Sequence, residues 1–145
     1  MDRSAIAISL IVAGGLMAAV VAGPDARATD KKEAYVSPEA ETKALVNEPL
    51  HGVEAQVVTI HRLTVPPGWV GGKHYHSGPV YVYVLEGSFT IDEQGKERRT
   101  LKAGEVYKEP IGTTMRARNL NTSEPLKLLV FQVTPEGEPR MVKAE

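Results

Sequence analysis

The chain has 145 residues, enough for one domain with a core of its own and too few for two comfortable domains. Its 17 basic and 18 acidic residues leave a formal net charge of −1, so it lacks the basic surface typical of nucleic-acid binding. The sequence contains no cysteine, which excludes disulfides, thiolate metal sites and thiol nucleophiles. Its 13 glycines and 10 prolines favour many turns over long helices.

Residues 1–28 have the layout of a secretory signal peptide. Arg3 is followed by an apolar run from Ala5 to Gly23 and then by Ala26-Arg27-Ala28, which predicts cleavage after Ala28. The alternative is an uncleaved membrane anchor, because the run is near the lower length limit for crossing a bilayer. In both cases we expect the folded part outside the cytoplasm, either periplasmic or secreted. Cleavage would leave it without a membrane attachment.

Residues 29–50 form a polar segment that allows one helical turn around residues 39–45. Residues 51–134 are different, because short β-branched and aromatic runs alternate with Gly- and Pro-containing turns about every ten residues. The expected strand runs are VEAQVVTIHRLTV, VYVYVLEGSFTI, RRTLKAG, EVYKEP, TMRARN and LKLLVFQVT. Residues 135–145 are polar, and we expect a loose tail. The pattern predicts an all-β domain, and periodicity alone leaves sandwich and barrel open.

The stretch KHYHSGPVYVYVLEG places His74 and His76 two residues apart, before an apolar strand. Residues two apart in a strand point to the same side, so the two imidazoles project together. Such a pair can begin a transition-metal site, but a stable site usually has three or four protein ligands. The pair alone is therefore also compatible with two histidines that face solvent or a polar pocket.

The residues around this pair resemble the first motif of the cupins, in GGKHYHSGPVYVYVLEG. A second stretch, GEVYKEPIGTTMRARN, is similar to the second cupin motif, with Gly104, Pro110, Gly112 and Asn119 at the family's spacing. The resemblance spans about residues 53–133. It implies a double-stranded β-helix, a small jelly-roll barrel. It also implies a homodimer, and Tyr81 and Tyr83 on the outer face of their strand are either core residues or contacts of that dimer.

Cupins typically hold a metal through two histidines and a glutamate of the first motif and a histidine of the second. His74 and His76 match, but the glutamate position is Val80 and the second-motif histidine is Met115. Met115 is either a soft ligand that would favour Cu(I) or a core residue. Half of the family's usual ligand set is therefore missing.

Glu109 is a candidate to replace the missing carboxylate. Cupins commonly have inward-facing residues three and five places after the glycine of the second motif, which here are Tyr107 and Glu109. A carboxylate inside an apolar barrel is unfavourable unless it is paired or coordinated, so we predict that Glu109 is a metal ligand. The alternative is an outward-facing Glu109 that forms a salt bridge with Arg or Lys.

Three further residues are expected to line the barrel pocket: His61, Val80 and Tyr107. His61 lies on the first barrel strand with the parity of Leu63 and Val65. It is either a pocket residue or the partner of a neighbouring carboxylate.

Three functions follow from this interpretation. The first is a barrel that holds a divalent transition metal (Fe, Mn, Zn, Ni or Cu) and acts on a small molecule, as a dioxygenase-like oxidoreductase, an isomerase or a lyase. The second is a non-catalytic cupin that binds a small molecule or a metal in an apolar pocket without a functional metal centre. The third is a module that binds a protein partner through its outer tyrosines. The fold alone does not choose among them.

Overall fold

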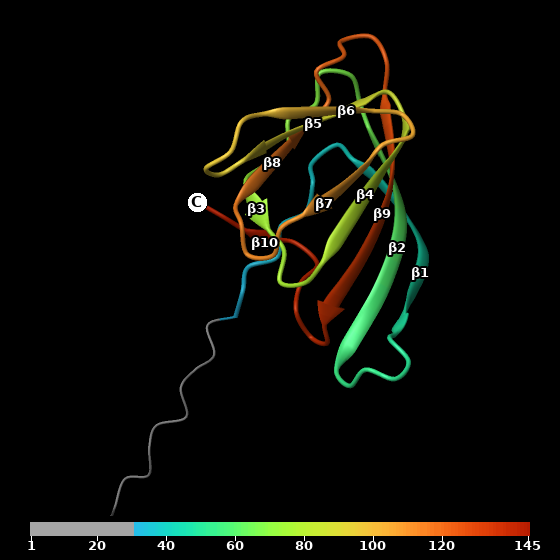
Figure 1. Cartoon of the computed structure of the whole chain (residues 1–145), viewed down its shortest axis with the longest axis vertical. Helices are drawn as coiled ribbons and strands as arrows, with labels where there is room; N and C mark the ends of the chain where they lie inside the picture. The colour runs from blue at the N-terminus through green and yellow to red at the C-terminus, as the bar shows by residue number, and fades with distance from the viewer. Residues whose placement is uncertain (1–30) are drawn as a thin grey trace, which may run out of the picture. The chain divides into compact units, whose positions relative to one another are not determined.

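The computed structural model describes residues 31–145, and the expected signal peptide, residues 1–28, lies outside them. The described chain is all β, as predicted, and its strands form two antiparallel sheets (Figure 1). No helix long and apolar enough to cross a membrane occurs in this part of the chain.

Within residues 31–145, each sheet has five strands. The first has the order β1-β2-β9-β4-β7 and the second the order β10-β3-β8-β5-β6, so both combine strands from distant parts of the sequence. The first sheet comprises β1 (Glu41–Pro49), β2 (Gln56–Val65), β4 (Val80–Glu86), β7 (Val106–Glu109) and β9 (Leu126–Pro135). The second comprises β3 (His74–Tyr75), β5 (Ser88–Glu93), β6 (Arg99–Lys102), β8 (Met115–Arg118) and β10 (Val142–Lys143).

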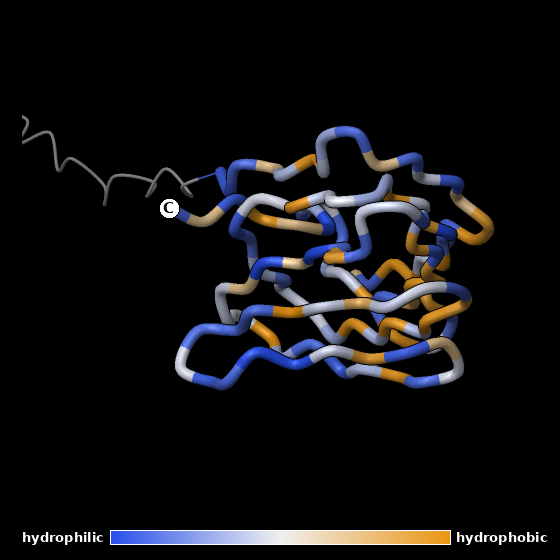
Figure 2. Tube along the Cα trace, turned by 90° about the horizontal axis from the view of Figure 1, so that it is seen from above, coloured by the Kyte–Doolittle hydropathy of each residue, from blue (hydrophilic) through white to orange (hydrophobic). Residues whose placement is uncertain are grey.

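Alternating side chains fill the space between the sheets. In β4, Val80 and Val82 are 0 % and 2 % exposed, whereas Tyr81 and Tyr83 are both 39 % exposed, which confirms the predicted parity. In β9, buried and partly exposed residues alternate along the whole strand. Figure 2 shows hydrophobic and hydrophilic residues interspersed along the chain. The inner faces of both sheets thus supply one core.

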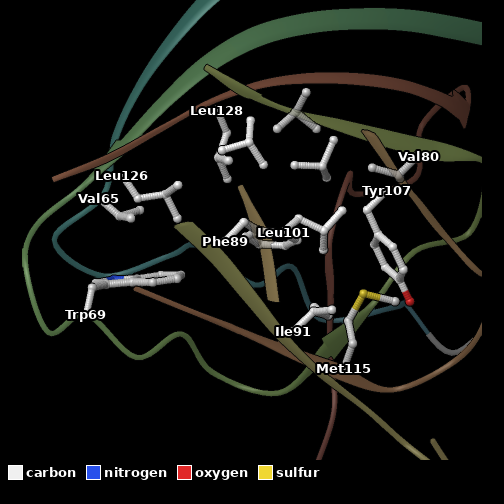
Figure 3. Close-up of a cluster of buried hydrophobic side chains, with 13 residues drawn as sticks. Val65, Trp69, Val80, Phe89, Ile91, Leu101, Tyr107, Met115, Leu126 and Leu128 are labelled. Atoms are coloured by element: carbon white, nitrogen blue, oxygen red, sulfur yellow. The ribbon is translucent and has the colours of Figure 1, made fainter. Parts of the chain in front are cut away.

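Hydrophobic side chains of both sheets form that core (Figure 3). Trp69 lies at one end of the cluster, where its indole Nε1 donates to the carbonyl of Pro38 at 2.7 Å. Met115 and Tyr107 lie at the other end. Phe89 is 1 % exposed, and burying a side chain of this kind contributes about 2–3 kcal/mol.

The run VYVYVLEGSFTI forms two strands, although the sequence predicted one. Gly87 has φ +84°, a left-handed backbone that favours glycine, and it separates β4 in the first sheet from β5 in the second. The alternation of apolar residues continues on both sides of this break, so hydropathy alone did not reveal the corner.

The two ends of the described chain also differ from the prediction. Residues 41–49, where the sequence allowed a helical turn, form strand β1, because β2 offers them an antiparallel partner along its length. The expected loose tail contains β10, in which Val142 pairs with Tyr75 and is 3 % exposed. Both segments therefore belong to the sheets, outside the predicted barrel limits of 51–134.

Candidate functional site

His74, His76 and Glu109 come together between the two sheets. Their exposed fractions are only 5 %, 3 % and 5 %. The His76 Nε2 atom lies 2.9 Å from a carboxylate oxygen of Glu109. The rings of His74 and His76 are nearly perpendicular, with centroids 5.1 Å apart. The structure thus places Glu109 inward and beside the histidine pair, not on the outer surface.

Both histidines are oriented through their Nδ1 atoms. His74 Nδ1 lies 3.0 Å from the carbonyl of Gly72, and His76 Nδ1 lies 2.7 Å from the carbonyl of Arg140. A carbonyl only accepts hydrogen bonds, so each Nδ1 carries the proton, and Nε2 of a neutral ring keeps its lone pair. Metal-binding histidines are commonly oriented in this way.

The register of the first sheet explains how Glu109 can take the place of the missing glutamate. Val80 in β4 pairs directly with Glu109 in β7, and directly opposed residues lie on the same face of a sheet. The carboxylate of Glu109 therefore faces the same interior as position 80, from the adjacent strand. On its other side Val80 pairs with Gln132 of β9, so Gln132 and Glu109 flank it.

The loop that follows the histidine pair packs closely against β9. A Cβ atom on Gly78 would lie 2.0 Å from the carbonyl oxygen of Val133, so only glycine fits at this approach. The amide of Gly112 donates to the carbonyl of His76 at 2.9 Å. Asn119 of the second motif has a structural role, because its side-chain amide donates to the carbonyls of Pro66 and Glu124.

A pocket opens next to the three candidate ligands. About 60 Å³ of it is open to water-sized molecules, which suits a few waters or one compact small molecule. Its polar lining consists of Ser37, Thr42, His61, His74, His76, Glu109, Gln132 and Arg140, and its apolar lining of Leu63, Trp69, Val82, Phe89, Ala117, Leu126, Leu128, Val130 and Met141. We call it the site pocket.

Two residues that contact His76 in this pocket, Gln132 and Arg140, were not anticipated. Gln132 is 1 % exposed, and its amide nitrogen donates to the carbonyl of Arg140 at 2.5 Å. The sequence did contain an indication for Gln132, because it is a polar residue at an inward position of the mostly apolar run LKLLVFQVT. No sequence pattern predicted Arg140 as a pocket residue, because it lies in the tail that was expected to be loose.

Burial controls the charge of two histidines. Desolvation lowers the pKa of His74, although the hydrogen bond to the Gly72 carbonyl and the charge of Glu109 act in the opposite direction. Desolvation, with the nearby positive charge of Arg140, lowers the pKa of His61 to about 4. Both rings are therefore neutral near neutral pH, the state in which imidazole binds metal ions or exchanges neutral hydrogen bonds.

The remaining predicted residues are all buried, but only His61 lines the site pocket. Met115 is 1 % exposed and belongs to the hydrophobic core, as does Val80. Tyr107 also lies in the core, and its hydroxyl donates to the carboxylate of Glu93. Burial and this carboxylate raise the pKa of Tyr107. These three residues pack beside the site.

The donor set suits a transition metal, but the atoms are not arranged around one point. Two imidazole nitrogens and a carboxylate oxygen are ligands that Fe, Mn, Zn, Ni and Cu accept. Within residues 31–145, however, no group of three His, Asp, Glu or Cys side chains has the spacing of a metal site. His76 and Glu109 contact each other directly instead, and a bound ion would require their separation.

Comparison with known proteins agrees with this architecture. Residues 61–132 match the family described as Cupin domain. This part of the chain is a cupin domain. The match begins at His61 in β2 and ends at Gln132 in β9, so it includes His74, His76 and Glu109.

The cupin domain resembles proteins of varied function. It is 26 % identical over 92 residues to an uncharacterised protein of Methanocaldococcus jannaschii, which covers 63 % of this chain and 76 % of the relative. The solved structure of an RmlC-like cupin from that organism has a TM-score of 0.50 at 26 % identity and covers 65 % of this chain and 82 % of the other.

Two further solved structures show the same fold. The DMSP lyase DddQ of Ruegeria pomeroyi has a TM-score of 0.58 at 18 % identity, over 73 % of this chain and 52 % of the other. KdgF from a Halomonas species has a TM-score of 0.53 at 24 % identity, over 68 % and 83 %. Identities this low support the shared fold and assign no activity to this chain.

Proposed function

We propose that this protein is an exported cupin that binds a divalent transition metal through His74, His76 and Glu109 and a small molecule in the site pocket. One observation carries the proposal. Both Nδ1 atoms are held by main-chain carbonyls, so that Nε2 of His74, and Nε2 of His76 once it separates from Glu109, can bind an ion in a buried space that also contains a carboxylate. Three protein ligands would leave coordination positions for a substrate or water.

The chemistry that such a metal supplies when bound is polarisation of a bound oxygen or activation of oxygen-containing ligands. The protein's own groups would hold the metal and exclude water. The site pocket is small and mostly apolar, which suits a compact organic substrate. Isomerase, lyase and dioxygenase reactions all remain compatible with this arrangement.

A second candidate function is binding without a metal. The direct contact between His76 Nε2 and Glu109 at 2.9 Å favours it, because with a proton between the two atoms this contact is a hydrogen bond that satisfies both groups without an ion. The barrel would then be a carrier or sensor for a small apolar ligand. The two candidates differ in one measurable property, the metal content.

Elemental analysis of the protein, purified after export and without a His tag, distinguishes them. The variants are His76→Ala and Glu109→Gln, and the matched controls are His51→Ala and Glu54→Gln, which change exposed residues. Near-ultraviolet circular dichroism of buried Trp69 confirms that each variant is folded.

We expect near-stoichiometric metal in the parent and in both controls, and its loss in both site variants. A parent that stays metal-free after incubation with iron, manganese, zinc, nickel and copper would eliminate the first candidate. Loss of metal in the controls to the same extent would show that the metal is bound elsewhere.

A further inference from the structure

Arg140 lies at the mouth of the site pocket, and its main chain is held from two sides. Its carbonyl accepts hydrogen bonds from His76 Nδ1 at 2.7 Å and from the side-chain amide of Gln132 at 2.5 Å. These contacts fix the position of Arg140 relative to the candidate metal ligand His76. Strand β10 follows two residues later and ties the same segment to the second sheet.

The side chain of Arg140 extends in the other direction, toward β2. Its Nη1 atom donates to His61 Nδ1 at 3.4 Å. Within residues 31–145, Arg140 forms no ion pair with an Asp or Glu side chain. A guanidinium ion that is turned into a pocket mouth without an acidic partner is a common binding group for carboxylates.

The neighbouring groups are also hydrogen-bond donors. Because His61 Nδ1 accepts from Arg140, the proton of the neutral His61 ring is on Nε2, which makes Nε2 a donor. Thr59 is only 6 % exposed, and its hydroxyl oxygen has no hydrogen-bond partner in the described part of the chain. Such a buried hydroxyl is unfavourable unless a ligand or water satisfies it.

These donors surround a hollow that adjoins the site pocket. It offers about 340 Å³ to water-sized molecules and is lined by Thr42, Ala44, Val46, Asn47, Thr59, His61 and Arg140. No Asp or Glu is among these lining residues of the described chain. The hollow and the site pocket share Thr42, His61 and Arg140. A ligand with an anionic end in the hollow could therefore extend its apolar part into the site pocket.

We propose that Arg140, with His61 and Thr59, binds the carboxylate of a small organic acid whose apolar part lies in the site pocket. The site pocket presents Leu63, Val82, Leu128 and Val130 to that apolar part. This inference rests on the proposed small-molecule pocket, and it names the chemical class of the ligand as a compact monocarboxylate.

Isothermal titration with butyrate tests the proposal, with butyramide as the neutral compound of the same shape. The variant is Arg140→Gln, which keeps the main-chain carbonyl that holds His76. The matched control is Arg62→Gln, because Arg62 is exposed and adjoins His61 on the opposite face of β2. Metal content is measured on the same samples, so that failure of the metal proposal is recognised separately.

We expect the parent to bind butyrate and to bind butyramide more weakly by at least about tenfold. Arg140→Gln should weaken butyrate binding by a similar factor, Arg140→Lys should recover part of it, and Arg62→Gln should leave it unchanged. Equal binding of butyrate and butyramide, absence of butyrate binding by the parent, or equal loss in Arg62→Gln would each overturn the assignment. If the parent contains no metal and these differences in butyrate binding are still observed, the metal proposal fails and the carboxylate site remains.

Discussion

The direct pairing of Val80 with Glu109 predicts that the carboxylate can be moved back to the strand on which cupins usually carry it. The test is a double-mutant cycle of Val80→Glu and Glu109→Val. The two Cβ atoms of a directly opposed pair are about 4.5–5.5 Å apart, so a glutamate at either position faces the same interior. The double variant therefore conserves the composition of the site and changes only the strand that bears the charge.

The magnitudes follow from the contacts of each group. Glu109→Val leaves His76 Nε2 without its 2.9 Å partner, which we expect to lower the free energy of unfolding by about 1–3 kcal/mol. Val80→Glu alone places a second buried carboxylate beside Glu109. It should lower the free energy of unfolding by about 3–5 kcal/mol. In the double variant, we expect the free energy of unfolding to fall by about 1–3 kcal/mol less than the sum of the losses in the two single variants.

Urea unfolding near neutral pH, with a chelator present, measures the four free energies. The same variants, without the chelator, are analysed for metal, and we expect loss in Glu109→Val and recovery in the double variant. Strictly additive losses of stability, together with no recovery of metal, would refute the idea that the two positions are equivalent.

Three further predictions concern single residues. Because the pKa of His61 is lowered to about 4, its contribution to stability is fully present above the unfolded value of 6.5 and is lost as the pH falls toward 4. Screening by solvent keeps this contribution below about 3 kcal/mol, and His61→Gln should flatten the pH dependence of urea unfolding. Gln132→Leu removes the donor to the Arg140 carbonyl and should weaken metal binding about 10–100-fold in a competition titration. Phe89→Ala should lower the unfolding free energy by about 3–5 kcal/mol, whereas Leu85→Ala on the outer face should have an effect below about 1 kcal/mol.

Each of these has a result that would contradict it. An unchanged pH dependence in His61→Gln would mean that other groups cause the acid sensitivity. Metal affinity equal to that of the parent in Gln132→Leu would show that the Arg140 carbonyl orients His76 without help. Equal losses for Phe89→Ala and Leu85→Ala would contradict the assignment of the two faces.

The arrangement of the inner faces could be predicted from the sequence because side chains alternate along a strand. The resemblance to the cupin motifs implied that Val80, counted back from Gly87, and Glu109, counted from Gly104, are inward positions, and strand alternation extended this to their neighbours. Their direct pairing was not predictable in the same way, because register depends on how β4 and β7 meet in the folded sheet.

The parts that the sequence did not reveal depend on long-range pairing. Residues 41–49 carry polar and charged side chains and become a strand only because β2 is available beside them. Arg140 reaches the site because β10 pairs with β3, a contact of two residues that leaves no hydropathy pattern in the tail. Gln132 could have been found, since a buried polar residue at an inward strand position needs a partner.

The most direct test of the central claim is an anomalous-scattering map from crystals of the protein purified after export, recorded on both sides of the absorption edge of the element found by elemental analysis. We predict a peak about 2.0–2.2 Å from Nε2 of His74, Nε2 of His76 and a carboxylate oxygen of Glu109. A map without a peak there, in crystals that retain the direct contact between His76 and Glu109, would contradict the metal site and leave a cupin that binds its ligand without a metal.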